Sequence, residues 1–466
     1  MIQLTEANHV HCVGIGGIGL SAIAEILMNE GYRVSGSDMK ESDTTDRLIE
    51  RGATVYLGHR ARNVGDADLL VYSSAIPMTN PEIEFAAENG IPAVTRAQML
   101  GHLMSRKGNS VAVAGAHGKT TTTAMVSLVL REAKKDPTIL VGGNLSEISG
   151  NVALGSGDYF VTEACEYMDS FLSLAPKYAV ILNIDSDHLD YFKDIDHIVR
   201  SFEQFANQVR DDGAVIAFDA NPFVSSIIDR TDKRVVTYGY NKRCDYSAGD
   251  IEFGSDGMPE FTVRRAGEKV CHIRLSVPGE HNISNALAAF ACCSEMGIEP
   301  DDIARTLERF GGTQRRFDMR GETFGGVMVI DDYAHHPAEI TATIRAARNL
   351  PHRSLWVLFQ PHTYTRTLAL HDDFAEALGF ADKVVIAEIY AAREKNIHQI
   401  SAKSIAVKMK ENDPNRDAWF FSSFEEISSF VLNNAEEGDL IITMGAGDIF
   451  KVGDLILEAD RVAHLK

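Results

Sequence analysis

The sequence predicts an α/β protein built from three successive domains, and its length, its alternating pattern and two restarts of that pattern lead to this prediction. A chain of 466 residues has room for about three domains of roughly 150 residues each. Short β-branched segments alternate with longer helical patterns almost throughout, which is typical of β-α-β units and parallel sheets. The alternation begins again near Ser110 and once more after Asp318. We therefore expect domains at 1–108, 109–312 and 313–466.

Each domain repeats this order of elements. The first runs from the strand-like HVHCVGI through the helical SAIAEILMNEG to the strand-like YRVSGSD and ADLLVYSSAI, which predicts a Rossmann-like fold. The second begins after the polar stretch SRKGN, and its alternating residues between Lys233 and Val277 predict an antiparallel patch added to a parallel sheet. In the third, GVMVIDDYA, LWVLFQ, KVVIAEI and DLIITMG are separated by helical patterns, so we expect another Rossmann-like domain.

The composition places the chain among globular proteins. Apolar residues make up 45% and charged residues 24%, which excludes a disordered, collagen-like or disulfide-framework protein. Acidic residues outnumber basic ones by 66 to 45, and a net charge of −21 repels nucleic acids and anionic membranes. An anionic substrate must therefore be held by local cations and helix N-termini.

The cysteines and the apolar segments bear on the cellular compartment. Six scattered cysteines without a CxxC pair predict reduced, buried thiols. The N-terminal residues lack a basic segment ahead of their apolar run, and no stretch approaches about 18 uninterrupted apolar residues. We expect a cytoplasmic monomer or homodimer without a nucleic-acid or membrane partner.

A glycine-rich loop, GIGGIG, joins the first predicted strand to the first predicted helix and matches the spacing G-x-G-x-x-G. Glycines there permit a tight turn and the close approach of a diphosphate, whose charge is stabilised by amides at the helix start. An acidic residue at the end of the next strand would accept a ribose hydroxyl. The pattern alone also allows a nicotinamide cofactor, or a glycine turn without a ligand. The residues concerned are Gly14, Gly16, Gly17, Gly19 and Asp38.

A second glycine loop, GAHGKT, follows the apolar strand VAVA and opens a helix. It is a shortened phosphate loop, because the pattern G-x-x-x-x-G-K-[ST] requires a glycine where this chain has Val113. Backbone amides and Lys119 would hold triphosphate oxygens while the Thr120 hydroxyl reaches Mg²⁺, so we expect a P-loop ATPase-type sheet in the central domain. The alternative is a surface turn with a solvated lysine. The loop residues are Gly115, Ala116, His117, Gly118, Lys119, Thr120 and Thr121.

Acidic and imidazole side chains follow two later strands of the central domain. They are Glu163, Glu166 and Asp169 of FVTEACEYMDSF, and Asp185, Asp187, His188 and Asp190 of ILNIDSDHLDYF. Because strand ends in α/β sheets open onto the ligand crevice, we expect these groups to meet the phosphates at the second loop. Imidazole is an unusual ligand for Mg²⁺, so His188 is equally a hydrogen-bonding residue at a strand end.

Two asparagines, Asn282 and Asn285, lie three residues apart near a predicted helix start in GEHNISNALAAF. This spacing puts both amides on one face of the helix. They would pair with the edge of an adenine or cap the helix.

Together these motifs resemble the Mur ligase family, the ATP-dependent amide-forming enzymes of peptidoglycan precursor synthesis. The resemblance covers essentially the whole chain and rests on AGAHGKTTTT, Glu163 after a strand, NIDSDHLDYF, GEHNISNALAA, GGTQRRFD and DDYAHHP. Two departures stand out. Many relatives carry threonine in place of Ala116, and ADESDAS in place of ACEYMDS, which leaves the roles of Glu166 and Asp169 open. Lys193 lies near the position of a carbamylated lysine in some relatives but does not match it.

The resemblance implies a separate duty for each domain. The N-terminal domain would bind a UDP-sugar, the central domain MgATP, and the C-terminal domain would close over both. The residues implied for the UDP-sugar are Gly14, Gly16, Gly17, Gly19, Asp38, Ser73 and Ser74. For ATP they are the loop residues 115–121 with Asn282, Asn285, Arg316 and Asp332, and for two metal ions Thr120, Glu163 and His188. The implied catalytic residues are Lys119, Glu163, His188 and Arg316. Candidates for muramate and alanine contacts are Tyr333, His335, His336, His362, Tyr364 and Arg366.

The resemblance also implies a reaction: ATP activates the lactyl carboxylate of UDP-N-acetylmuramate as an acyl phosphate, which the amine of L-alanine attacks. Mg²⁺, which Mn²⁺ could replace, would assist, and His188, His335 and His336 are alternatives for a general base. Alternatives within the family are a sister ligase and a recycling ligase that adds a peptide to the same UDP-sugar. The sister ligases include folylpolyglutamate synthetase, which lacks this N-terminal diphosphate loop. Alternatives of another class are a nicotinamide-dependent dehydrogenase and a nucleotide-hydrolysing switch or motor.

Overall fold

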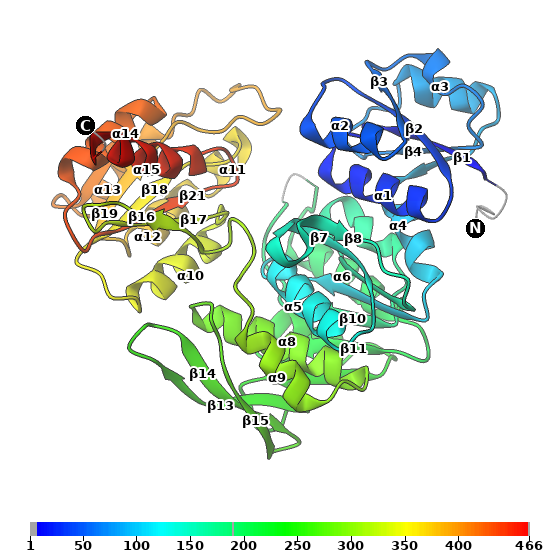
Figure 1. Ribbon diagram of the computed structural model, residues 1–466. Helices are drawn as coiled ribbons and strands as arrows, with labels where there is room; N and C mark the ends of the chain where they lie inside the picture. Colours follow the sequence, from blue (N-terminus) through cyan, green and yellow to red (C-terminus); the bar gives the residue numbers. More distant parts are fainter. Residues whose placement is uncertain (1–6, 189–190, 465–466) are drawn as a thin grey trace. The chain divides into compact units, whose positions relative to one another are not determined.

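The structure, a computed structural model, describes residues 7–188 and 191–464. Internal contacts divide the chain into two compact units, Met1–Ser247 with Ala288–Ile303, and Ala248–Leu287 with Ala304–Lys466. Three sheets, mostly of parallel strands with helices between them, make up the fold (Figure 1). The predicted α/β class with three parallel-sheet cores is confirmed.

The first sheet has five parallel strands in the order β3-β2-β1-β4-β5. Its strands are β1 (His9–Val13), β2 (Arg33–Asp38), β3 (Thr54–Leu57), β4 (Leu69–Tyr72) and β5 (Ala93–Thr95). The helices between them are α1 (Ile18–Asn29), α2 (Asp43–Glu50) and α3 (Pro81–Glu88), and α4 (Arg96–Ser105) follows β5. Helices α2 and α4 begin at capping boxes, and α3 begins at Asn80 followed by a proline, so local sequence fixes where these helices start.

The order of the first sheet reverses between β1 and β4, because β1 leads to β2 on one side while β4 lies on the other. Ligands bind at such a switch point, outside the carboxyl ends of the strands. The first glycine loop follows β1, and Ser73 and Ser74 follow β4. This arrangement brings the two predicted segments to the same edge of the sheet.

The second sheet has ten strands in the order β15-β14-β13-β12-β11-β10-β6-β9-β7-β8. The first six in sequence are β6 (Asn109–Ala114), β7 (Thr138–Leu145), β8 (Gly150–Ala153), β9 (Tyr159–Glu163), β10 (Tyr178–Ile181) and β11 (Ala214–Phe218). The other four are β12 (Val235–Gly239), β13 (Tyr246–Phe253), β14 (Pro259–Arg265) and β15 (Glu268–Arg274). Its helices are α5 (Lys119–Glu132), α6 (Ile195–Asn207), α7 (Pro222–Ile228), α8 (Glu280–Glu295) and α9 (Pro300–Glu308).

The predicted antiparallel patch between Lys233 and Val277 is only partly right. Strand β12 pairs parallel with β11, and β13 pairs parallel with β12, so both continue the parallel sheet. Strands β14 and β15 pair antiparallel, as predicted, and β13 lies beside β14 in the sheet, joined to it by a connection too short for a parallel crossover. Alternation in the sequence does not give strand direction, whereas helix α7 between β11 and β12 provides the crossover that parallel pairing requires.

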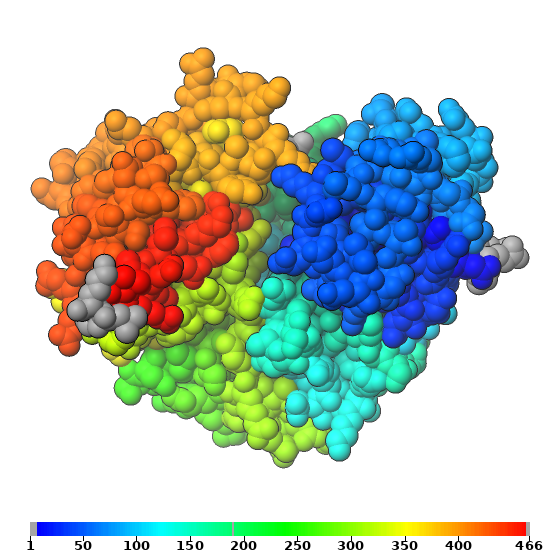
Figure 2. All heavy atoms as spheres, turned by 45° about the horizontal axis from the view of Figure 1, so that its top comes forward, coloured from blue at the N-terminus to red at the C-terminus, as the bar shows by residue number. Residues whose placement is uncertain are grey.

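The third sheet has the order β16-β17-β21-β18-β19-β20, in which only the β16–β17 pair is antiparallel. Its strands are β16 (Asp318–Glu322), β17 (Met328–Asp332), β18 (Leu355–Phe359), β19 (Lys383–Ile386), β20 (Asp417–Phe420) and β21 (Leu440–Met444). Its helices are α10 (Pro337–Arg348), α11 (Tyr364–Ala369), α12 (His371–Leu378), α13 (Lys403–Asn412), α14 (Phe424–Asn434) and α15 (Phe450–His464), the last red at the surface in Figure 2. Separate apolar clusters pack on its two faces.

Two further expectations concern the cysteines and the membrane. All six cysteines lie within the described residues and are thiols, not disulfides, with Cys12, Cys244, Cys292 and Cys293 buried. Among the described residues, no helix has the length and apolar character needed to cross a bilayer.

Candidate functional site

The first glycine loop is held against the end of β2. Gly14, with φ +84°, and Ile15 donate backbone hydrogen bonds to the Ser37 carbonyl at 2.8 and 3.0 Å, and Gly16 donates to Asp38 Oδ2 at 2.9 Å. A Cβ on Gly16 would lie 2.9 Å from that same carboxylate oxygen. Asp38 therefore shapes the loop directly, a contact that the expected ribose role did not include.

A cavity of about 360 Å³ opens beside this loop, and its walls come from the start of α1, the residue after β4, the start of α4, and strands β7, β8 and β9 of the second sheet. Of the residues predicted from sequence, it is lined by Gly17, Gly19, Ser73 and Glu163, whereas Ser74 is exposed and lies outside the lining. The lining also includes Arg96, Gly142, Asn151 and Cys165. Arg96 is the cation among these lining residues, and its guanidinium lies 3.1 Å from where a Cβ on Gly19 would be. The cavity thus pairs glycine amides with one positive side chain, which suits an anion.

The second glycine loop joins β6 to α5. Gly118 begins the helix in the left-handed region, with φ +85°, and it has no side chain to cap the helix. The first amides of α5 are therefore available to an anion, and the helix dipole favours negative charge there. Thr120 is buried and Thr121 half-buried in the first turn. This loop has the geometry that phosphate binding requires.

Lys119 faces a carboxylate. Its Nζ donates to Glu166 at 2.9 and 3.0 Å, and also to the carbonyls of Gly115 and Ala116. Burial alone would lower the pKa of Lys119, but the nearby Glu166 and Glu163 raise it above its ordinary value. The lysine is therefore a fixed cation at the mouth of the loop.

Glu163 and Glu166 have different surroundings, although only two residues separate them. Glu163 accepts a hydrogen bond from the Gly142 amide at 2.6 Å and lines the cavity. Glu166 is buried, and His188 Nε2 lies 3.9 Å from its Oε1. Asp169 accepts hydrogen bonds from Tyr191 and Ser201, so it ties segments together within the fold. The structure thus brings Glu163 to the cavity and Glu166 to Lys119 and His188.

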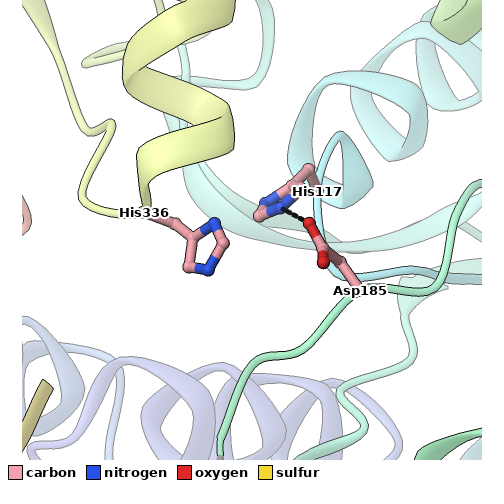
Figure 3. Close-up of side chains that lie close together, drawn as sticks. All are labelled: His117, Asp185 and His336. Atoms are coloured by element: carbon pink, nitrogen blue, oxygen red, sulfur yellow. Dashed lines mark ion pairs between the residues drawn. The ribbon is translucent and has the colours of Figure 1, made fainter. Parts of the chain in front are cut away.

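His117 and Asp185 form an ion pair, with His117 Nε2 3.5 Å from Asp185 Oδ2 (Figure 3). His117 lies on the second loop, and Asp185 on the segment after β10. His188, further along that segment, lies against Tyr167, with the ring centroids 4.8 Å apart and the ring planes tilted by 42°. Asp190, which the sequence places beside these residues, lies outside the described residues.

Asn282 and Asn285 interact with each other in the first turns of α8. Asn285 Nδ2 donates to Asn282 Oδ1 at 3.1 Å, and Asn282 Nδ2 donates to the Pro278 carbonyl at 2.7 Å. Both side chains are buried. The expected placement on one helix face is observed, and their amides are used in local hydrogen bonds.

Two adjacent arginines precede β16, and they differ in their contacts. Arg315 donates to Asp331 Oδ2 at 3.0 Å and to the Gly445 carbonyl at 2.7 Å. Arg316, the predicted residue, lies 3.8 Å from Glu339, and both guanidinium groups lie 5.0 Å from the Tyr333 ring. Asp332 accepts backbone hydrogen bonds from Phe317 and Ala334 at 2.8 and 2.7 Å. The predicted pair Arg316 and Asp332 therefore lies within one cluster.

The remaining candidates lie at the starts of α10 and α11. His335 contacts Glu339 at 3.2 Å, and His336 caps α10 by accepting from the Ala338 amide at 3.4 Å. His362 stacks on Tyr390 at 5.6 Å, and burial, assisted by the charge of Arg366, lowers its pKa. Tyr364 and Arg366 lie on α11.

Family models match the chain over three consecutive ranges. They are the Mur ligase family catalytic domain at residues 9–108, the Mur ligase middle domain at 113–293, and the Mur ligase glutamate ligase domain at 315–447. The chain belongs to the Mur ligase family. The resemblance seen in the sequence motifs is confirmed.

Two curated relatives of this Mur ligase have the same name. The UDP-N-acetylmuramate–L-alanine ligase of Acetivibrio thermocellus is 48% identical, over 98% of this chain and 97% of the relative. That of Alkaliphilus metalliredigens is 46% identical over 97% of both chains. Among solved structures, the UDP-N-acetylmuramate–alanine ligase of Thermotoga maritima has a TM-score of 0.81 and 31% identity, covering 98% and 99% of the two chains. A murein peptide ligase of Psychrobacter arcticus has a TM-score of 0.71 and 26% identity, covering 97% and 98%.

Three residues of this Mur ligase site were not given a role from sequence. Arg96 lies in the cavity, Asn183 contacts the second loop, and Glu166 pairs with Lys119. Arg96 and Asn183 have one signal in the sequence, since each comes shortly after a strand of a parallel sheet. The pairing of Lys119 with Glu166 has no such signal, because Glu163 ends β9 and Glu166 lies only three positions further on, so the sequence does not indicate which carboxylate meets the lysine.

Proposed function

We propose that this Mur ligase uses ATP to join L-alanine to the lactyl carboxylate of UDP-N-acetylmuramate, giving UDP-N-acetylmuramoyl-L-alanine, ADP and phosphate. The reaction would serve peptidoglycan precursor synthesis in the cytoplasm. The observation that carries the proposal is full-length identity of 46–48% to relatives of that description. Both glycine loops and Lys119 support it, because the reaction needs one site for a diphosphate and another for a triphosphate.

The chemistry explains why ATP is needed. A carboxylate does not form an amide at neutral pH, since oxide is too poor a leaving group. The lactyl oxygen attacks the γ-phosphorus, the bond to the β-phosphate oxygen breaks, and ADP leaves. The neutral amine of L-alanine then attacks the acyl carbon, phosphate leaves, and a base takes the proton from nitrogen. Lys119 and the first amides of α5 would stabilise the charge on the phosphates.

Mg²⁺ would neutralise phosphate charge when bound, and the residues fit a hard cation. Thr120 lies in the first turn of α5, and Glu163 lines the cavity, so both offer oxygen ligands. His188 is the less suitable donor, and Glu166 lies 3.9 Å from its imidazole. We propose Thr120 and Glu163 for one ion and His188 for a second.

The activity is tested by measuring phosphate release with UDP-N-acetylmuramate, ATP and a panel of L-alanine, glycine, L-serine and a tripeptide. Release that needs both the UDP-sugar and L-alanine is expected. Preference for the tripeptide would indicate a recycling ligase instead. NAD binding without ATP consumption would indicate a dehydrogenase.

The role of Lys119 is tested by Lys119→Ala together with Lys119→Ala/Glu166→Gln. The single variant leaves the buried Glu166 carboxylate without its lysine, which destabilises the protein, whereas the double variant removes that charge as well. We expect the double variant to regain thermal stability but not phosphate release, and to keep its affinity for UDP-N-acetylmuramate. Normal turnover in either variant would contradict the assignment.

A further inference from the structure

The backbone of the second glycine loop is hydrogen-bonded by the side chain of Asn183, which lies in another segment. Asn183, on the segment after β10, accepts a hydrogen bond from the His117 amide through Oδ1 at 2.9 Å and donates from Nδ2 to the His117 carbonyl at 3.0 Å. Its own carbonyl accepts from the Ala116 amide at 3.3 Å. Three hydrogen bonds from one residue therefore fix two consecutive residues of the loop.

This contact matters because the loop is short. By sequence it lacks the first glycine of a standard phosphate loop, so fewer of its own residues can define its shape. Asn183 bonds both sides of His117 and thereby fixes the peptide planes before and after that residue. Gly118, with φ +85°, and Lys119 follow directly. The direction of the first amides of α5 is set by these planes.

The same segment also excludes other loop shapes. A Cβ on Gly115 would lie 3.0 Å from Leu182 Cβ and 3.2 Å from the Asn183 amide nitrogen. The loop and the segment after β10 are thus packed at backbone distance, and movement of one displaces the other.

We propose that Asn183 is a positioning residue for the nucleotide phosphates: it holds the shortened loop in its phosphate-binding shape through His117, without touching the ligand. The inference rests on the proposed function in taking ATP as the ligand of this loop. It assigns a role to a residue that lies five positions before His188 and belongs to none of the implied ligand sets.

Asn221 provides a matched control. Its Nδ2 donates to the carbonyl of Ile184, the residue next to Asn183, at 3.2 Å. Its Oδ1 accepts hydrogen bonds from the Phe223 and Val224 amides, both at 3.1 Å. It therefore supports the same segment and caps α7, but has no hydrogen bond to the loop among the contacts of the described residues. Substitution of Asn221 therefore shows what general disturbance of the segment after β10 does to nucleotide binding.

The test compares Asn183→Ala, Asn183→Asp and Asn221→Ala in the full chain. Calorimetry with ADP and Mg²⁺ gives nucleotide affinity, steady-state kinetics give KM for ATP and for UDP-N-acetylmuramate, and melting gives stability. We expect Asn183→Ala to weaken ADP binding and raise KM for ATP by about tenfold or more, because two hydrogen bonds are lost. KM for UDP-N-acetylmuramate should change less than about twofold. Asn221→Ala should lower the melting temperature and leave both nucleotide values near wild type.

Asn183→Asp adds a pH readout. An ionised carboxylate at this position cannot donate to the His117 carbonyl, whereas a protonated carboxyl has one donor and one acceptor, as the asparagine uses here. The ratio of variant to wild-type ADP affinity should therefore approach one as pH falls toward about 4 to 5. A purely structural role would not produce this rescue.

The inference is overturned if Asn183→Ala binds ADP within about twofold of wild type, or if Asn221→Ala weakens ADP binding as much. Should Asn183→Ala fail to fold, the pH dependence of ADP affinity in Asn183→Asp tests the role of Asn183 instead. Failure of the proposed function looks different: wild type would then bind ADP but release no phosphate with UDP-N-acetylmuramate and L-alanine. Calorimetry still decides the role of Asn183 in that case.

Discussion

Arg315 and Arg316 are neighbours in sequence with opposite roles in the structure. The Arg315 guanidinium is bonded to the buried Asp331 and to the Gly445 carbonyl, so it belongs to the fold. The Arg316 guanidinium lies 3.8 Å from Glu339. Both guanidinium groups lie 5.0 Å from the Tyr333 ring, so this ring does not separate the two arginines. The sequence RRFD by itself does not distinguish them.

We predict that Arg315→Ala lowers the free energy of unfolding by about 3 kcal/mol, because the buried Asp331 carboxylate loses its cation. Arg316→Ala should leave stability within about 1 kcal/mol but raise KM for ATP, with UDP-N-acetylmuramate affinity unchanged. Chemical denaturation and calorimetry measure both effects. Equal loss of stability in the two variants would contradict this division.

Asp332 makes stability depend on pH. Burial raises the pKa of its carboxyl to about 6, despite the opposing effect of Arg316 and two backbone amides. In the unfolded chain an aspartate has a pKa of about 3.9. Between these values the native carboxyl keeps its proton while the unfolded one loses it, so stability falls as pH rises through this window.

Asp332→Asn should therefore reduce the change in unfolding free energy between about pH 4 and about pH 7, by about 2 to 3 kcal/mol. Denaturation curves at both pH values give the free energy of unfolding at each pH. Because the two values are subtracted, any pH-independent effect of the substitution on stability cancels. The exposed Asp417 provides a control, since Asp417→Asn should leave the difference as it is in wild type. An unchanged difference in Asp332→Asn would refute the argument.

At the scale of an element, helix α3 holds the first glycine loop through a buried carboxylate. Glu82 accepts hydrogen bonds from Ser37 Oγ at 2.5 Å, Asn63 Nδ2 at 2.7 Å and the Arg60 amide at 3.2 Å. Burial opposes ionisation, but His11, Ser37 and Asn63 hold the pKa of Glu82 at about 2. Because the Ser37 carbonyl accepts hydrogen bonds from the Gly14 and Ile15 amides, α3 is connected to the first glycine loop, the proposed diphosphate site.

We expect Glu82→Gln to destabilise the protein by about 2 kcal/mol, since one acceptor oxygen is replaced by an amide that faces donors. It should also weaken UDP binding. Glu84 on the same helix is exposed, and Glu84→Gln should change stability by less than about 0.5 kcal/mol. Thermal melting with and without UDP measures both effects, and similar melting of the two variants would rule out the role given to α3.

At the scale of the whole molecule, the two glycine loops are the sites proposed for two anions in a protein with a net charge of −21. Each loop follows the first strand of its sheet and opens a helix. Each also has a glycine that a side chain would disturb: Gly16 against Asp38, and Gly115, with φ +147°, against Leu182. In this proposal, local amides and cations would offset the repulsion that the net negative charge exerts on an anion.

Gly16→Ala and Gly115→Ala should consequently separate UDP binding at the first glycine loop from nucleotide binding at the second. We predict that Gly16→Ala loses stabilisation by UDP and keeps stabilisation by ADP, while Gly115→Ala does the reverse. Ligand-induced shifts in melting temperature provide the measurement. Gly311→Ala, at a position with nothing within 4 Å of the added Cβ, is the control. Loss of both shifts in either variant would mean that the loops do not act independently.

The sequence by itself determined the α/β class, the two loops and the family, because strand-helix alternation and glycine spacing are local properties of the chain. It also put Lys119, Glu163 and His188 at strand and helix ends, where ligands bind in such folds. The tertiary structure alone decided that Glu166 pairs with Lys119, that Asn183 holds the second loop, that Arg96 enters the cavity and that β12 runs parallel to β11. These features depend on which segments meet across a sheet, and contacts between distant residues leave no periodic signal in a single sequence.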